Sequence, residues 1–190
     1  AIIPQIAMSA GTMIACACKA IIMGKQSSIG PIDPHFGGIP AHGVIAEFQR
    51  AIEETQNNPL TIPIWQAVVS KYHPTFIGEC ENAIKLSEEM VSKWLSECMF
   101  QEEKNPVLQA NKVVNELNNH EKTKTHARHI NIDQAKGLGL KIIDLENDDF
   151  FQDLVLTIHH AYMHTFATTN AIKIVENHDE NAIIYFSEGS

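Results

Sequence analysis

A sharp corner at residues 8–12, Met-Ser-Ala-Gly-Thr, constrains the fold of this chain more than any other sequence feature. The apolar run that precedes it, at residues 2–6, predicts the end of a buried strand. Small residues follow the corner, among them Ala15 and Ala17, as a helix needs when it packs closely against a sheet. The corner therefore predicts a strand that turns directly into a helix lying on a sheet, an arrangement typical of α/β proteins.

Short apolar runs alternate with longer helical patterns along the rest of the chain. We expect further strands at residues 20–23, 140–145, 172–175 and 182–186. We expect helices at residues 42–56, 62–72, 74–98, 106–117, 133–138 and 147–166, with Pro74 in the first turn of the third and Asn147 capping the last. Residues 24–40, rich in Gly and Pro, and the polar residues 118–129 predict loops. We therefore predict an α/β chain with one domain over residues 1–190.

The composition excludes several classes of function. The 14 Lys and Arg against 23 Asp and Glu give a net charge of −9, and the residues show no basic stripe. Binding of nucleic acid needs clustered basic residues to neutralise phosphates, so we expect no nucleic-acid partner. The same acidity argues against adhesion to an anionic membrane surface. The 44% of apolar residues are enough to build a core, which excludes a disordered acidic tail.

The N-terminal residues predict a piece of a longer protein. The chain begins at Ala1 inside an apolar run, without the basic region of a secretory signal. We expect a domain that lacks its N-terminal strands. The run at residues 6–23 contains Lys19 and several small or polar residues, so we do not expect it to span a membrane. We expect a cytoplasmic protein, with membrane association only through an anchor in the missing N-terminal part.

The cysteines and histidines of the chain are predicted to pack against other residues and not to bind a metal. Cys16, Cys18, Cys80 and Cys98 are predicted to be small core residues in a reducing compartment, because Cys-x-Cys is too tight for a zinc knuckle. His160 and His164 lie four apart on one predicted helix face, a spacing that holds zinc in other proteins, but the pattern lacks the accompanying Glu. A third ligand would have to come from elsewhere, such as Asp153 or His126. We expect no metal and no cofactor.

Ser9 is the candidate nucleophile. A nucleophilic serine needs an exposed oxygen, backbone N–H groups that await the oxyanion, and a base. Its place between a strand and a helix, followed by Ala10 and Gly11, offers the first two. The alternative from the residues alone is that Ser9 caps the helix, because Ser is a preferred cap.

Two motifs resemble a known family. Residues 4–12, Pro-Gln-Ile-Ala-Met-Ser-Ala-Gly-Thr, and residues 28–34, Ser-Ile-Gly-Pro-Ile-Asp-Pro, are similar to the serine dehydrogenase proteinases. These are relatives of signal peptide peptidase and the Clp protease subunit. Weaker likenesses continue at residues 129–140 and 173–177, so the resemblance covers most of the chain. It implies a ClpP/crotonase-like spiral of strand–strand–helix units, partial here. It also implies a homo-oligomer, a polypeptide substrate, Ser9 as nucleophile and the Ala10 N–H as an oxyanion donor.

The sequence leaves the identity of the general base open. Asp33 stands where the Clp protease subunit has its histidine, and Ala127 stands where that protein has its aspartate. One hypothesis is a permuted triad with His126 or His129 as base and Asp33 orienting it. The other is a Ser–Lys dyad, for which Lys71 is the best candidate, provided that it is desolvated.

Three functions are compatible with the sequence. The first is a serine peptidase that forms an acyl-enzyme on Ser9. The second is an oligomeric scaffold of the same fold that has lost the chemistry. The third, a crotonase-like acyl-CoA enzyme, would need a basic site for the CoA phosphates, which this acidic chain does not show.

Overall fold

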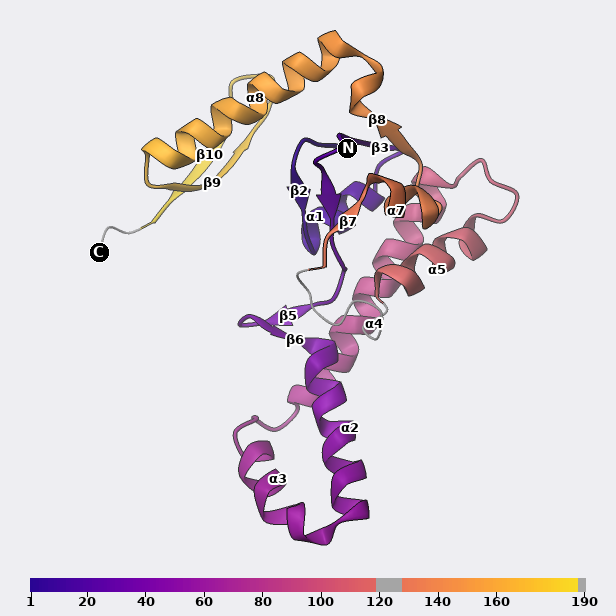
Figure 1. Ribbon diagram of the computed structural model, residues 1–190, viewed down its shortest axis with the longest axis vertical. Helices are drawn as coiled ribbons and strands as arrows, with labels where there is room; N and C mark the ends of the chain where they lie inside the picture. The colour runs from indigo at the N-terminus through magenta and orange to yellow at the C-terminus, as the bar shows by residue number, and fades with distance from the viewer. Residues whose placement is uncertain (119–127, 188–190) are drawn as a thin grey trace. The chain divides into compact units, whose positions relative to one another are not determined.

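The computed structural model describes residues 1–118 and 128–187 (Figure 1). The chain divides into two compact units, Ala1–Asp144 and Leu145–Ser190. Strands and helices alternate along it, which confirms the α/β class. That residues 1–190 form a single domain stays a prediction.

Three segments of the first unit build two small sheets, because each segment contributes one strand to each sheet. The first sheet is parallel and has the order β1 (Ile2–Ile3), β3 (Ile21–Met23), β8 (Ile142–Asp144). The second has the order β2 (Ile6–Ala7), β4 (Ser28–Ile29), β7 (Ile130–Asn131). In it β2 and β4 are parallel and β7 is antiparallel to β4.

The bends between the two sheets have local causes. The run at residues 2–6 is two strands and not one, because Pro4 has no N–H to continue a ladder. At the neighbouring bend the buried Ser27 hydroxyl donates to the Ile3 carbonyl at 2.5 Å and accepts from the Gly24 N–H at 2.9 Å. The Ser27 side chain therefore joins the two segments where their backbones stop pairing.

The described residues of the first unit form six helices around or beyond these sheets: α1 (Ala10–Cys16), α2 (Ala41–Asn57), α3 (Ile62–Val69), α4 (Phe76–Trp94), α5 (Pro106–Leu117) and α7 (Ile132–Gly137). A 3₁₀ turn, η1 (Pro59–Thr61), precedes α3, and a π turn, η2 (Leu95–Met99), follows α4. None of the helices in the described residues combines the length and the apolar character that crossing a membrane requires.

The main core lies between the sheets, α1, the end of α4 and α5. Ile21, Leu95, Phe100 and Val113 are among its fully buried side chains. A smaller cluster joins the start of α2 to the start of α4 and contains Ala41, Val44, Phe76 and Cys80. Phe36, in the segment that follows β4, packs against this smaller cluster, which holds that segment near α2.

Several local expectations need correction. Residues 24–40 are not a plain loop: they contain β4 and a hairpin of β5 (His35–Phe36) and β6 (Ile39–Pro40), whose turn is made by Gly37 and Gly38 at positive φ. The helix expected from Pro74 begins at Phe76, because Thr75 has a left-handed φ of 76° that a helix cannot continue. Part of the loop expected at residues 118–129 lies outside the described residues.

The second unit consists of a 3₁₀ turn, η3 (Leu145–Asn147), helix α8 (Asp149–Thr168) and a hairpin of β9 (Ala171–Glu176) and β10 (Ala182–Phe186). The hairpin confirms the two strands expected in the tail. The expected cap was wrong: Asn147 belongs to η3, and the Asp148 carboxylate accepts from the Phe151 N–H at 2.9 Å instead. A carboxylate at this end is also favoured by the helix dipole.

The four cysteines are free thiols that differ in burial. Cys16 and Cys80 are buried, whereas Cys18 and Cys98 are half-buried, so the expectation of four core residues holds only for the first pair. Burial, with a smaller contribution from the neighbouring Cys18, raises the pKa of the Cys16 thiol to about 12. Because only thiolates react readily with alkylating reagents, Cys16 is held in an inert form.

We expect iodoacetamide at pH 8 to modify Cys18 and Cys98 in the native chain and to leave Cys16 unmodified. Peptide mapping by mass spectrometry measures the extent at each site, and the urea-unfolded chain, in which all four thiols are accessible, is the control. Modification of native Cys16 as fast as Cys18 would contradict the burial that raises its pKa.

Candidate functional site

Ser9 lies at the junction of β2 and α1 in an unusual backbone conformation. Its φ of 49° and ψ of −114° fall outside the regions that L-residues normally occupy. Such a conformation costs on the order of 1–3 kcal/mol and persists where the surrounding structure imposes it, often at functional sites. The half-buried Ser9 makes no side-chain cap hydrogen bond to α1. The interpretation of Ser9 as an ordinary helix cap is therefore wrong.

The residues after Ser9 bring α1 close to the strands. A β-carbon built on Gly11 would lie 3.3 Å from the Ala7 β-carbon, so a larger residue would push the helix off the strand. The hydroxyl of the fully buried Thr12 donates to the Ala7 carbonyl at 2.8 Å and accepts from the Gly30 N–H at 3.0 Å. Thr12 thus ties together the end of β2, the helix and the residue after β4.

The ends of three strands meet beside Ser9. Ala7 pairs with Ile29, and Ile29 pairs with Ile130 in the antiparallel strand β7. Met8, Gly30 and His129 therefore come next at the same edge of the sheet. A β-carbon at position 30 would lie 2.5 Å from the Met8 sulfur, so glycine there leaves room for the Met8 side chain.

His129 is held at this edge by a side chain from β4. Its Nδ1 lies 2.8 Å from the hydroxyl of Ser28, which is itself buried. Two strand spacings of about 4.8 Å separate β2 from β7. In this sheet His129 immediately precedes the third strand, β7, and Ser9 comes two residues after the end of the first, β2.

Asp33 follows β4 and is buried, with 5% of its surface exposed. Its Oδ1 accepts from the His42 N–H in the first turn of α2, at 3.4 Å. The neighbouring Pro34 carbonyl accepts from the Ala41 N–H at 2.9 Å. Burial raises the pKa of the Cys80 thiol on α4, with smaller contributions from the carboxylates of Glu79, Asp33 and Glu81. Asp33 therefore joins the loop after β4 to the N-terminal end of α2, where a negative charge is favourable.

A chain of hydrogen bonds continues from α2 across two further helices. His42 Nε2 lies 2.9 Å from Oδ1 of the buried Asn118, at the end of α5. The Asn118 amide donates to the Glu88 carboxylate on α4 at 2.6 Å. These three side chains connect α2, α5 and α4 close to Asp33.

Among the described residues, no hydrogen bond or ion pair joins the Ser9 side chain to Asp33, His129 or the remaining predicted residues. Lys71 follows α3, is exposed, and so lacks the desolvation that a neutral lysine requires. His126 lies outside the described residues. His160 and His164 are exposed on α8, in the second unit, and the described part of the chain contains no cluster of three or more potential metal ligands.

The comparison with protein families decides the identity of the chain. A family model described as "ClpP-like SDH-type serine proteinase" matches residues 1–154. The chain belongs to this family. The match includes Ser9, Ala10 and Asp33, and it confirms the family indicated by the motifs at residues 4–12 and 28–34.

The relatives found for this family member are uncharacterized. The protein MJ1495 of Methanocaldococcus jannaschii is 29% identical over 141 residues, which cover 74% of this chain and 41% of that protein. The protein MJ0137 of the same organism is 42% identical over 53 residues, or 28% of this chain and 17% of that protein. The chain thus spans less than half the length of the curated relatives it matches. No solved structure is significantly similar to it.

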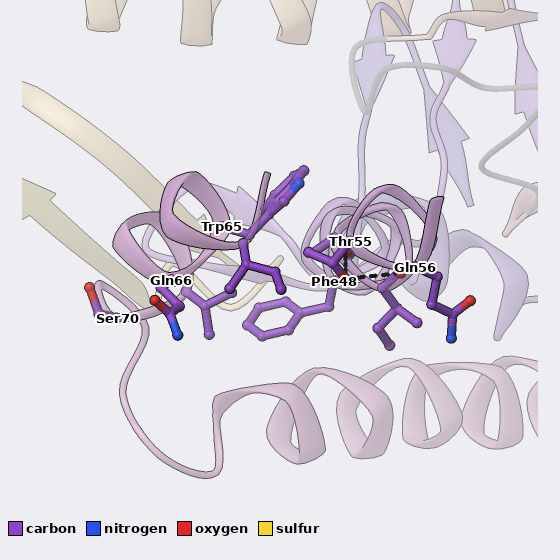
Figure 2. A pocket seen from close by; sticks show the side chains of 10 residues that line it. Phe48, Thr55, Gln56, Trp65, Gln66 and Ser70 are labelled. Carbon is purple, nitrogen blue, oxygen red and sulfur yellow. Dashed lines mark hydrogen bonds between the residues drawn. The ribbon is translucent and has the colours of Figure 1, made fainter. Parts of the chain in front are cut away.

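An apolar pocket of about 600 Å³ lies between α2 and α3, apart from the serine corner of this proteinase-family chain (Figure 2). Phe48 and Thr55 of α2 and Trp65 of α3 are among the residues that line it, and the Thr55 hydroxyl donates to the Ala51 carbonyl at 2.7 Å. None of the residues that line it is titratable, so it supplies no acid or base.

Sequence reasoning missed the residues that hold the site together. Thr12 is part of the quoted corner motif, yet only the structure shows that its hydroxyl links two strands. His42, Glu88 and Asn118 carry no motif, and 76 residues separate His42 from Asn118. Single polar residues on α2, on α4 and at the end of α5 give no signal in the sequence that they meet.

Proposed function

We propose that this chain carries the nucleophile of a serine peptidase and cleaves peptide bonds through an acyl-enzyme on Ser9. The observation that carries the proposal is the strained corner that holds the Ser9 side chain out of any helix cap. A strained strand-to-helix turn that exposes a serine oxygen is the arrangement used by other serine hydrolases. Membership of a serine proteinase family supports the same chemistry.

The proposed reaction has two steps. The Ser9 oxygen gives its proton to a base and bonds to the carbonyl carbon of the substrate, and the Ala10 N–H donates to the resulting oxyanion. The carbon–nitrogen bond then breaks, and the base returns the proton to the leaving amine. A water molecule, deprotonated by the same base, splits the ester and restores the Ser9 hydroxyl.

For the base we propose His126, with Asp33 as the carboxylate that orients it. Burial of Asp33 near the carboxyl end of β4 supports the second role. His129 is the alternative base, supported by its place at the Ser9 edge and by its hydrogen bond to Ser28. Lys71 is the third candidate and has the least support, because its side chain is exposed.

A fluorophosphonate probe tests the proposal, since it phosphonylates activated serines and releases fluoride. We expect the parent chain to be labelled and the His126→Ala variant to react about 10²-fold more slowly, as loss of a general base does. The Lys71→Ala variant is expected to react like the parent. His178→Ala, at an exposed histidine, is the matched control.

The outcome of this series separates the candidates. A slow His129→Ala variant beside a normal His126→Ala variant would transfer the role of base to His129. If the His126, His129 and Lys71 variants all react like the parent, no base assignment survives. A parent chain that takes no label would favour the second function, an oligomeric scaffold that has lost the chemistry.

The remaining features of the proposal concern the whole protein. We propose a polypeptide substrate, a homo-oligomer and a spiral of strand–strand–helix units in one domain, on the strength of the family membership. Four free cysteines are typical of a reducing compartment and support a cytoplasmic location. Membrane association through a further segment of the protein belongs to the same proposal.

A further inference from the structure

We propose that the hydrogen-bonded chain Glu88–Asn118–His42 positions the Asp33 carboxylate for the reaction at Ser9. These three side chains are positioning residues, since they act through Asp33 and do not touch the reacting atoms. The inference rests on the proposed function, in which Asp33 orients the base.

The orientation of each group in the chain follows from its chemistry. The Glu88 carboxylate accepts hydrogen bonds, so the Asn118 group that lies 2.6 Å from it is the NH₂. The Asn118 carbonyl therefore faces His42, and His42 Nε2 must donate to it across 2.9 Å. The His42 Nε2 therefore carries a proton in this arrangement. The chain runs in one direction, from donor His42 to acceptor Glu88.

The first turn of α2 needs this support. It follows the β5–β6 hairpin, whose turn is formed by two glycines, so the chain before it is easily deformed. The apolar cluster of Ala41 and Val44 with α4 holds α2 down, but apolar contacts are non-directional. A directional bond from the His42 ring fixes the rotation of the first turn about the helix axis.

That rotation decides where Asp33 lies. The His42 N–H that donates to the Asp33 Oδ1 is in the same residue as the ring that Asn118 holds. The contact is already long at 3.4 Å, so a small rotation breaks it. The titratable side chains of this region include Asp33 on the loop, His42 on α2, and Glu79, Cys80, Glu81 and Glu88 on α4.

The test replaces Asn118 with alanine in the whole chain, labelled with ¹⁵N. Asn115→Ala is the matched control, because Asn115 is an exposed asparagine on the same helix. Three quantities are measured: the tautomer of His42 by ¹⁵N NMR, the hydrogen-exchange rate of the His42 amide, and the fluorophosphonate labelling rate against pH. Should Asn118→Ala fail to fold, His42→Ala supplies the same comparison, with His42→Gln as the conservative variant that keeps a donor.

We expect the parent to show the Nε2–H tautomer, and Asn118→Ala to exchange the His42 amide at least about tenfold faster. We expect its labelling rate to fall about tenfold to 10²-fold, as sub-ångström to ångström misplacement does. The acidic limb of its pH profile moves to lower pH, because a displaced carboxylate no longer stabilises the charged base. Loss of structure alone would not move that limb.

The experiment can overturn the positioning role and the proposed function separately. Unchanged exchange in Asn118→Ala, or faster exchange with an unchanged labelling profile, overturns the positioning role. A parent that takes no label at all overturns the proposed function. In that case the exchange rate alone decides whether the chain of hydrogen bonds holds the contact between His42 and Asp33.

Discussion

Replacing Ser9 with alanine is expected to lower the rate of peptide or ester hydrolysis by on the order of 10³-fold or more, because no acyl-enzyme can form without the hydroxyl. The rate is measured with an activated ester and with a mixture of fluorogenic peptides. Ser70→Ala is the control, since it makes the same chemical change at an exposed helix end. Hydrolysis by Ser9→Ala at the parent rate would contradict the assignment of the nucleophile.

The same substitution is expected to leave the fold intact. The Ser9 side chain makes no cap hydrogen bond, so its removal costs α1 little. A Ser9→Gly variant adds a sharper control, because glycine occupies a φ of 49° without the strain that serine bears. We expect the free energy of unfolding of Ser9→Gly to equal or exceed that of the parent. We expect Ser9→Gly to be as inactive as Ser9→Ala. This result would show that the loss of activity at position 9 is not caused by a loss of stability.

Replacing Thr12 with valine is expected to lower the free energy of unfolding by about 1–3 kcal/mol. Valine has the shape of threonine but no hydroxyl, so the two hydrogen bonds of the Thr12 hydroxyl are lost, while the Gly30 N–H keeps its 3.1 Å bond to the Ala7 carbonyl. The net contribution of each hydrogen bond is about 0.5–1.5 kcal/mol, and the loss of both gives the expected range. Urea unfolding followed by circular dichroism measures the change.

Thr12→Ser provides the comparison for this prediction, because serine keeps the hydroxyl and loses only a methyl group. We expect it to be more stable than Thr12→Val. A valine variant within about 0.5 kcal/mol of the parent would show that Thr12 fills space without linking β2 to β4. The corner at Ser9 would then be held by apolar packing alone.

Local patterns in the sequence predicted local structure well. The corner at residues 8–12 and the helix at residues 106–117 appear where the residues place them, as β2–α1 and α5. Each depends on interactions between residues only a few positions apart. The hairpin of the tail was predicted for the same reason.

Competition between neighbouring residues limited the precision of these predictions. Asp148 caps α8 in place of Asn147, since both are good caps and a 3₁₀ turn takes up Asn147. Pro4 divides what the apolar pattern indicated as a single strand. In each case the pattern indicated the right kind of element, and a single residue, Asp148 or Pro4, set its boundary.

The contacts that shape the candidate site lie beyond such reasoning. Asp33 was predicted as a site residue, but its contact with the first turn of α2 depends on how the loop after β4 folds back. The bond of His42 to Asn118 joins residues 76 positions apart on two helices. No periodicity or motif records which polar side chains meet across such a distance.

The most direct test of the central claim is to find where a fluorophosphonate binds. The labelled chain is digested, and tandem mass spectrometry locates the phosphonyl group on the modified peptide. We predict one modified residue, Ser9, and no modification at this peptide in the Ser9→Ala variant. A label on any other residue, or a Ser9→Ala chain labelled as strongly as the parent, would contradict the account.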